Sequence, residues 1–316
     1  METPLTTARL IVCTLALGLS GLALAQTTIE KLAPENTVFV AGADNVNASI
    51  ERLKRTGLWE LWQSDKMQAL WTDVMKSAEE GVADALKDLG VEKDSLQPPT
   101  GPVGLAVFPV KDEELGTSLP GFLLMADYGE NADKTAELIK AVVERAEKDG
   151  DIEIEQKDVL GRSVQVITEV EKVEVVEEEV EADAGDGEED MEFEFEEGPD
   201  PIEEALKTLH WVREGNSFLI SSTMDAMTGA LQTIDGKGEK NITDRSEYQA
   251  LLDKIGEHEV FAMLLTRDVL QLGGDESGLM EMMVPMIRSA VGHVKGYGMG
   301  VRLDGPAAMV EQTLAV

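Results

Sequence analysis

The chain has 316 residues, of which 62 are acidic and 27 are basic, so its formal net charge at neutral pH is −35. Hydrophobic residues make up 43% of the sequence, which supports a folded core and excludes a wholly disordered chain. A negative field of this size repels nucleic acid and anionic lipid, and we exclude both as main partners.

The N-terminal segment has the features of a secretory signal peptide. Arg9 precedes an apolar stretch at 10–25, and Ala23 and Ala25 fit the small-residue pattern of a cleavage site before Gln26. The stretch is short for a membrane span, and a retained N-terminal anchor is the alternative interpretation. The sequence therefore predicts a signal peptide at 1–25 and a periplasmic or secreted protein with no membrane span after cleavage.

The next part of the chain predicts a first α+β domain at 26–170. Its strands are expected at 37–41, 104–110, 121–126, 152–155 and 163–167. Its helices are expected after Asn45 or Asn47, at 65–90 and at 132–148. The two strands at 104–110 and 121–126 have the pattern of a buried hairpin. The element order indicates a split βαβ layout, in mixed or antiparallel sheets with helices on one sheet face.

An acidic segment interrupts the chain at 171–200. From Glu169 to Asp200 it contains 17 acids and one base, Lys172. Valines alternate with glutamates in its first part, and Phe193 and Phe195 do so near its end, which is typical of extended strands around a loose acidic tip. The two interpretations are a solvated low-complexity spacer, or an extended hairpin that contacts cations or basic partners.

The tip of this segment is also the candidate metal site. Its carboxylates are hard oxygen ligands of the kind that Ca²⁺ or Mg²⁺ prefers, so weak binding at several sites is one hypothesis. An EF-hand is excluded because Met191 stands where the sharp turn needs glycine. The candidate ligands are Asp183, Asp186, Glu188, Glu189 and Asp190.

Residues 201–316 predict a second α+β unit. We expect a hairpin of 210–214 with 217–221 around Gly215-Asn216, then helices at 224–233, 248–255 and 279–291, and strands at 260–265, 294–303 and 307–316. Gly296, Gly298 and Gly300 fall in a strand pattern, where they leave one face flat for a packed helix. The sequence stops in apolar strand residues, so we expect a C-terminally truncated chain.

Three segments together resemble a family of exported bacterial proteins of unknown function. They are APENTVFV at 33–40, LWELW at 58–62 and WVREGNSFLIS at 211–221. In that family, strand–helix units recur over several hundred residues. The resemblance implies an envelope protein without an assigned activity, and a longer native chain.

No catalytic motif is found in the sequence. The histidines His210, His258 and His293 lack the three- or four-residue spacing of a helical zinc site, and the nucleophile-elbow, P-loop and Ser-x-x-Lys patterns are absent. The only cysteine, Cys13, lies in the predicted signal peptide, so the mature chain would have no disulfide or cysteine nucleophile. We expect no cofactor beyond weakly bound Ca²⁺ or Mg²⁺.

Two apolar sets are interpreted as core rather than as sites. Methionine fills irregular gaps, so a cluster near 280 is expected to pack rather than to bind copper. The tryptophans at helical spacing are interpreted in the same way. These residues are Met280, Met282, Met283 and Met286, and Trp59, Trp62 and Trp71.

Three hypotheses for function follow. The first is a non-enzymatic envelope protein, an interaction or structural module for an envelope protein or a basic partner. The second is divalent-cation binding through the acidic segment. The third is a hydrolase of unrecognised type, which a pocket with converging titratable side chains would favour.

Overall fold

The computed structural model describes residues 27–67, 97–111, 118–170, 201–266, 294–304 and 307–315. Within these residues the helices are short, except one of 17 residues. They are α2 (Ile29–Leu32), α3 (Val46–Leu53), α4 (Gly57–Trp62), α6 (Ala132–Lys148), α7 (Pro201–Leu206), α8 (Met224–Ile234) and α9 (Ser246–Ile255), with the 3₁₀ turns η2 (Gly129–Asn131) and η3 (Ile242–Asp244).

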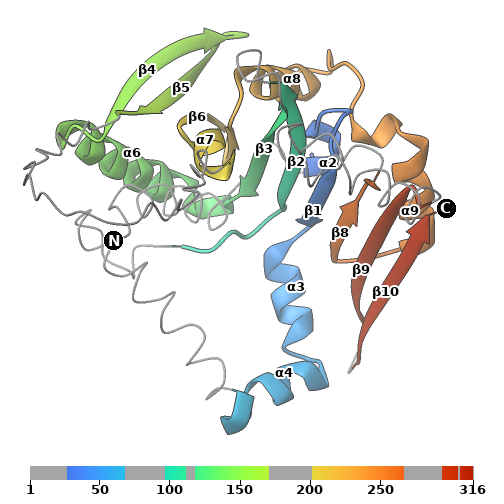
Figure 1. The fold of residues 1–316 in the computed structure, drawn as a ribbon. Helices are drawn as coiled ribbons and strands as arrows, with labels where there is room; N and C mark the ends of the chain where they lie inside the picture. Colours follow the sequence, from blue (N-terminus) through green and yellow to red (C-terminus); the bar gives the residue numbers. More distant parts are fainter. Residues whose placement is uncertain are drawn as a thin grey trace, which may run out of the picture.

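The described strands form one ten-stranded sheet (Figure 1). Its order is β10-β9-β8-β1-β2-β3-β7-β6-β5-β4, and each neighbouring pair is antiparallel. The strands are β1 (Phe39–Ala43), β2 (Val103–Lys111), β3 (Ser118–Asp127), β4 (Ile152–Val159), β5 (Arg162–Glu169), β6 (Thr208–Glu214), β7 (Ser217–Ser221), β8 (Val260–Leu264), β9 (Gly296–Asp304) and β10 (Ala307–Ala315).

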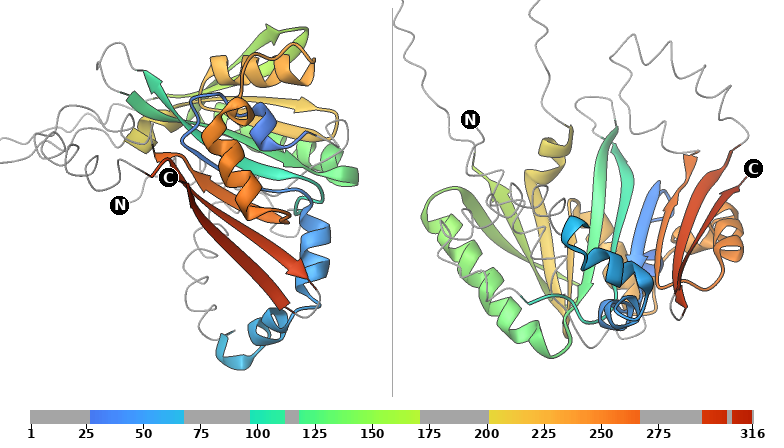
Figure 2. Two further views of the ribbon diagram at one scale, coloured as in Figure 1. Left: turned by 90° about the vertical axis from the view of Figure 1, so that its right-hand side faces the viewer. Right: turned by 90° about the horizontal axis from the view of Figure 1, so that it is seen from below.

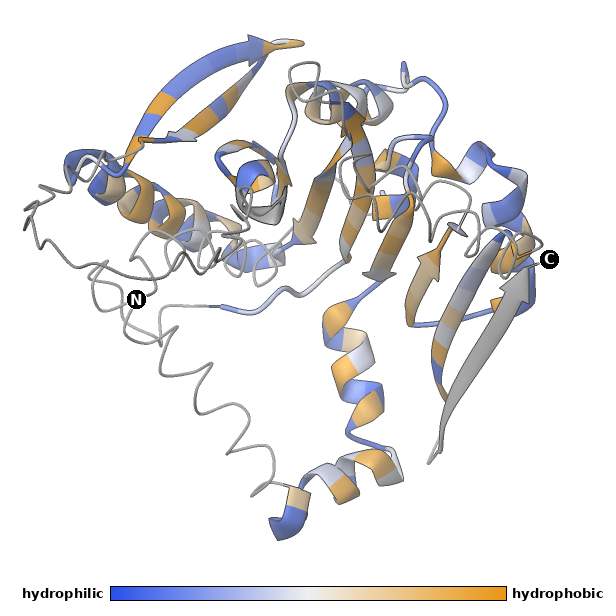
Figure 3. Ribbon diagram, viewed as in Figure 1, coloured by the Kyte–Doolittle hydropathy of each residue, from blue (hydrophilic) through white to orange (hydrophobic). Residues whose placement is uncertain are grey.

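Both faces of the sheet carry helices (Figure 2). The residues of β3 show which helices pack on which face, because neighbouring side chains of a strand point to opposite faces of the sheet. Leu123 and Met125 belong to the larger core cluster, under α2, α8 and α9, whereas Ala126 packs with residues of α6. We call the face of the sheet under α2, α8 and α9 the α8 face, and the opposite face, under α6, the α6 face. Figure 3 shows apolar residues concentrated on β1 to β3, whereas β4 at the edge is mainly hydrophilic.

The α+β class is confirmed, but two details differ from the expected layout. Helices cover both faces rather than one, because central strands such as β3 and β7 are apolar on both sides. The split βαβ arrangement is not formed, since β1, β2 and β3 are antiparallel neighbours in chain order. Strands of both predicted units enter the one sheet, through the β1–β8 and β3–β7 pairings.

Glycines let two helices approach the sheet closely. A Cβ on Gly104 would lie 2.2 Å from Cγ2 of Ile29, so α2 sits directly on β2. On β9, Cβ atoms at Gly296 and Gly300 would lie 2.9 and 3.3 Å from side-chain atoms of Leu251 and Ile255 on α9. The expected flat strand face for a packed helix is therefore confirmed at Gly296 and Gly300.

Several sequence-based predictions lie outside the described residues. They include most of the helix predicted at 65–90, with Trp71, and the methionine-rich helix at 279–291 with His293. Trp59 and Trp62 lie in α4 and are only half-buried. Neither tryptophan belongs to the buried core formed by the described residues.

Candidate binding groove

A cavity of about 650 Å³ opens on the α8 face of the sheet. Segments from four regions of the chain surround it: the turn after α2, the end of β2 with the start of β3, one side of α8, and the loop before η3. Its lining residues are Leu32, Ala33, Pro34, Glu35, Asn36, Phe108, Pro109, Val110, Lys111, Ser118, Thr223, Asp225, Ala226, Thr228, Gly229, Gln232, Thr233, Glu239, Lys240 and Asn241.

Hydrogen bonds fix the wall opposite α8. The Asn36 side chain donates from Nδ2 to the carbonyl of Pro109 at 3.0 Å, which ties the turn after α2 to β2. Pro34 and Asn241 form an isolated β-bridge, and the amide of Ile242 donates to the carbonyl of Ala33 at 3.1 Å. The two loops are therefore held to each other and to the sheet.

The other wall is α8, and its sequence explains its orientation. Thr223 is the N-cap, and its hydroxyl accepts a hydrogen bond from the amide of Ala226 at 3.3 Å. The residues buried against the sheet recur at helical spacing and are Ala226, Met227, Ala230 and Leu231. Asp225, Gly229 and Gln232 also line the groove, where the helix meets solvent. The amphipathic period of α8 thus places a polar side at the groove.

Three uncharged polar side chains of the lining are not engaged within the described structure. The side chains of Ser118 on β3 and of Thr228 and Gln232 on α8 make no hydrogen bond or ion pair with any part of the chain that the structure describes. All three residues are partly exposed. Thr228 and Gln232 are four residues apart, so they lie one turn apart on the same side of α8. Their donors and acceptors are available to a ligand.

The charges of the groove are mixed in sign. Lys240 Nζ lies 3.9 Å from Oε1 of Glu35, and both side chains are largely exposed. Lys111, Asp225 and Glu239 are the other charged residues among the described lining. This arrangement presents no field of a single sign, in contrast to the strongly acidic composition of the whole chain.

The predicted site residues fall outside the described structure. Asp183, Asp186, Glu188, Glu189 and Asp190 lie in 171–200, and Ala23, Ala25 and Gln26 precede residue 27. Within the described ranges, no group of three or more histidine, cysteine, aspartate or glutamate side chains could hold a metal ion. The same ranges contain no helix that is both long and apolar enough to cross a membrane.

The described histidines do not form one site. His210 is buried in β6, its Nδ1 lies 3.3 Å from the carbonyl oxygen of Ser221, and burial lowers its pKa. His258 precedes β8, and its ring contacts that of Phe261. Four strands separate β6 from β8 in the sheet, which corresponds to roughly 24 Å.

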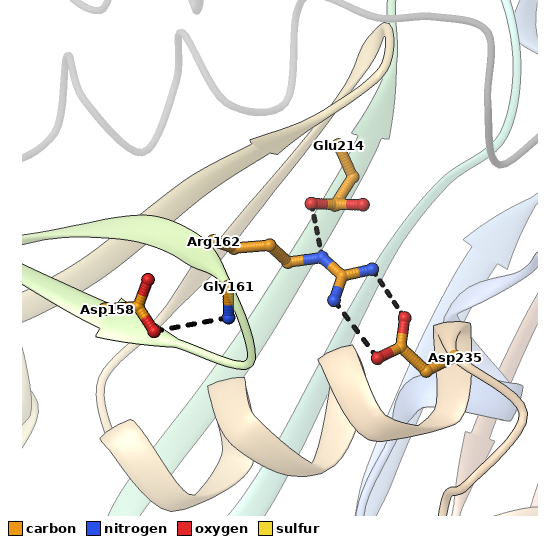
Figure 4. Close-up of polar contacts among 5 residues, drawn as sticks. All are labelled: Asp158, Gly161, Arg162, Glu214 and Asp235. Carbon is orange, nitrogen blue, oxygen red and sulfur yellow. Dashed lines mark hydrogen bonds and ion pairs between the residues drawn. The ribbon is translucent and has the colours of Figure 1, made fainter.

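An ion-paired cluster beside α8 had no signal in the sequence. Arg162, the first residue of β5, donates from Nε to Glu214 Oε1 at 2.6 Å and from its two terminal nitrogens to Asp235 at 2.7 and 3.2 Å (Figure 4). These hydrogen bonds lower the pKa of Asp235. The cluster joins the β4–β5 hairpin to the end of β6 and to the C-terminus of α8.

Comparison of the chain with protein-family models, with curated proteins and with solved structures finds no match.

Proposed function

We propose that this chain is an exported, non-enzymatic interaction module of the bacterial envelope, and that the groove beside α8 is its binding surface. The proposal rests mainly on one observation: hydrogen bonds hold the walls of the groove in place, while some polar side chains of its lining have no partner in the described structure. Asn36 and the Pro34–Asn241 bridge hold the walls, whereas Ser118, Thr228 and Gln232 offer unengaged polar groups. A preformed groove loses less conformational entropy when a ligand binds.

The volume of the groove is suited to a small ligand or to one segment of a longer ligand. Binding sites for such ligands usually enclose about 300–1,000 Å³, combine apolar surface with a few polar groups, and are largely preformed. The groove has this volume and combines Val110 and Phe108 with hydroxyl and amide side chains. Thr228 and Gln232 lie on the polar side of the amphipathic helix α8, and there they face the opposite wall of the groove.

Export is the second part of the proposal, and the N-terminal pattern supports it. Arg9, the apolar stretch at 10–25 and the Ala23–Ala25 spacing are the features on which signal peptidase acts. The net charge of −35 would favour basic partners over anionic ones in the envelope.

The test uses Gly229→Trp to fill the groove. A Cβ at Gly229 would meet no atom within 4 Å, so a larger side chain can start into open space there, and thermal unfolding of the variant checks that it is folded. The wild-type chain and the variant are each incubated with the soluble fraction of a cell-envelope digest. Compounds retained on the folded protein are then separated by native gel filtration and identified by mass spectrometry.

We expect compounds that the wild-type chain retains and the variant does not, and we expect them to be recovered chemically unchanged. Identical retention by the two proteins would remove the groove as the binding surface. Release of a compound in altered covalent form, by the wild-type chain alone, would contradict the non-enzymatic part and favour a hydrolase.

A further inference from the structure

The uncharged polar groups of the lining that have no partner in the described structure are of one chemical kind. Ser118 and Thr228 carry hydroxyls, and Gln232 carries an amide, so each side chain both donates and accepts hydrogen bonds. The fixed side chains contribute in the same way: Asn36 uses Nδ2 for Pro109 and leaves its Oδ1 as an acceptor, and Asn241 uses Oδ1 for Thr243 and leaves its Nδ2 as a donor. A ligand rich in hydroxyl groups matches such a surface, since a hydroxyl also donates and accepts.

The charges disfavour an anionic ligand. Among the described residues, the lining has three carboxylates, of Glu35, Asp225 and Glu239, against the ammonium groups of Lys111 and Lys240. Lys240 already lies close to Glu35. Phosphate recognition needs converging cationic or backbone N–H donors, and the net charge of −35 repels anions in addition. The groove therefore fits an uncharged ligand better than a nucleotide or a phosphorylated one.

The backbone of the groove floor disfavours an extended peptide. Pro109 of β2 pairs with Pro120 of β3. Among the described residues, β1 no longer pairs with β2 and β7 no longer pairs with β3 at this position, and the Asn36 side chain already donates to the carbonyl of Pro109. A peptide strand would add at a strand edge through backbone hydrogen bonds, and proline has no N–H to donate.

The length of the groove fits a chain of linked rings. The lining residues of α8 run from Asp225 to Thr233, a helix length of about 12 Å at 1.5 Å per residue. Val110, which is half-buried, provides apolar surface opposite, and the C–H faces of sugar rings are apolar. Polar groups on α8 and apolar surface at Val110 therefore occur together along one groove.

From these four observations we propose that the groove binds an uncharged oligosaccharide. This inference rests on the proposed function, because it names the ligand class of the same groove. Thr228 and Gln232 bind sugar hydroxyl groups from α8, Ser118 does so from β3, and Val110 contacts a ring face.

The experiment is calorimetric titration of the chain, purified as the cell exports it, with three uncharged tetrasaccharides: cellotetraose, maltotetraose and tetra-N-acetylchitotetraose. The variants are Thr228→Val and Gln232→Met, which keep the size of the side chain and remove its hydrogen-bonding groups, and Gly229→Trp, which fills the groove. Gln63→Met is the matched control, because Gln63 is exposed beside α4, far from α8 (Figure 1).

We expect saturable binding of at least one tetrasaccharide, with Kd raised about five- to tenfold by Thr228→Val and by Gln232→Met, as the loss of one hydrogen bond predicts. Gly229→Trp should abolish binding, and Gln63→Met should leave Kd unchanged. Circular dichroism and thermal unfolding confirm that each variant is folded.

Two results would overturn the proposal. The first is the absence of saturable binding by all three tetrasaccharides at millimolar concentration. The second is binding that Gly229→Trp leaves unchanged, which would place the sugar elsewhere. A capped tetra-alanine peptide is titrated in parallel: its binding, lost in Gly229→Trp while no sugar binds, would overturn the ligand class and leave the groove as a binding surface.

Discussion

Arg162 and Asp235 meet through two hydrogen bonds between a guanidinium fork and a carboxylate, although 73 residues separate them in the chain. Asp235 is the C-cap of α8, where the helix dipole disfavours a negative charge, and the guanidinium of Arg162 compensates for it. Glu214 binds the remaining side of the same fork. The β4–β5 hairpin is thereby fixed to the helix that forms one wall of the groove.

Arg162→Ala should therefore destabilise the fold by about 1 kcal/mol. Hydrogen bonds to charged groups are worth about 1.5–3 kcal/mol, and we discount this because the Arg162 and Glu214 side chains are 19% and 18% exposed and solvent screens such pairs. The measurement is the denaturation midpoint in urea. Arg162→Lys is the control, and it should recover only part of the loss because an ammonium cannot form the fork.

The stability that this pair contributes depends on pH. Because Arg162 lowers the pKa of Asp235 in the folded state, the contribution is present above the ordinary aspartate value and is lost as pH falls through the lowered pKa. The difference between wild type and Arg162→Ala should thus shrink in acid. An equal difference at all pH values would mean that packing of the arginine stem, and not the ion pair, stabilises the hairpin.

Local sequence patterns predict many of the helices and strands of this fold. They do not predict the order in which the strands pair in the sheet. The helix at Ala132–Lys148 has its predicted bounds, and Asn45 caps α3 as expected, because period and capping are properties of neighbouring residues. The order of the strands depends on pairings such as β1–β8, between segments more than 200 residues apart. The four-residue helix α2 is too short to show a period, and its two buried residues, Ile29 and Leu32, pack in the larger core cluster, where Ile29 lies against Gly104.

The candidate groove could not be predicted from the sequence, because it too is formed by segments that are far apart in the chain. Its walls come from turns, a strand and a helix at residues 33–36, 108–111, 223–233 and 239–241, and no spacing in the chain connects them. Thr228 and Gln232 have the pattern of the ordinary polar side of an amphipathic helix. What distinguishes them is the opposite wall, which the Asn36–Pro109 hydrogen bond sets in place.

Two glycine substitutions should have opposite effects on stability. Gly229 lies inside α8 with open space around a Cβ, so Gly229→Ala should stabilise the protein by about 0.5–1 kcal/mol by lowering the entropy of the unfolded chain. Gly161 also has open space, but its φ of +77° is a left-handed conformation, so Gly161→Ala should destabilise by about 1 kcal/mol. Chemical denaturation of both variants checks this. A loss of stability in Gly229→Ala would show that the helix needs glycine for close contact.

Gly104→Ala should destabilise the fold by about 1–3 kcal/mol through overpacking. The new Cβ would lie 2.2 and 2.4 Å from side-chain carbons of Ile29, which is 1% exposed and cannot move into solvent without leaving the core. Ile29→Ala removes the nearer of these carbons, Cγ2, keeps Cβ, and has its own cavity cost. In the double variant the two losses should be clearly less than additive when unfolding is followed by fluorescence. Strict additivity would mean that α2 does not pack on β2 at this point.

Processing at the predicted cleavage site can be tested directly. Ala25→Tyr places a large side chain where signal peptidase requires a small one, so the exporting cell should accumulate an uncleaved, membrane-associated precursor. Gel mobility and fractionation provide the readout, and N-terminal sequencing of the wild-type product should begin at Gln26. The matched control is Leu24→Tyr, because residue 24 lies between the two small positions and already carries a large side chain. Equal processing of Ala25→Tyr and wild type would remove this site.

Asp127 should make the fold less stable as pH rises. It is only 4% exposed at the end of β3, and burial raises its pKa, while the hydroxyl of Ser217 donates to its Oδ2 at 3.4 Å and opposes the rise. A raised folded-state pKa means that the stability is fully present below the ordinary aspartate value and is lost as pH rises through the raised pKa. Asp127→Asn does not titrate, so its stability relative to wild type should increase over the same range.

Urea denaturation of both proteins, from acid to neutral pH, measures this difference. Ser217→Ala is the informative companion, because it removes the hydrogen bond that favours the charged carboxylate. It should lower the stability of the Asp127 protein at neutral pH more than in acid, and should show no such pH dependence in the Asp127→Asn background. A constant offset between wild type and Asp127→Asn at every pH would mean that the carboxylate keeps enough contact with water to ionise freely in the folded state.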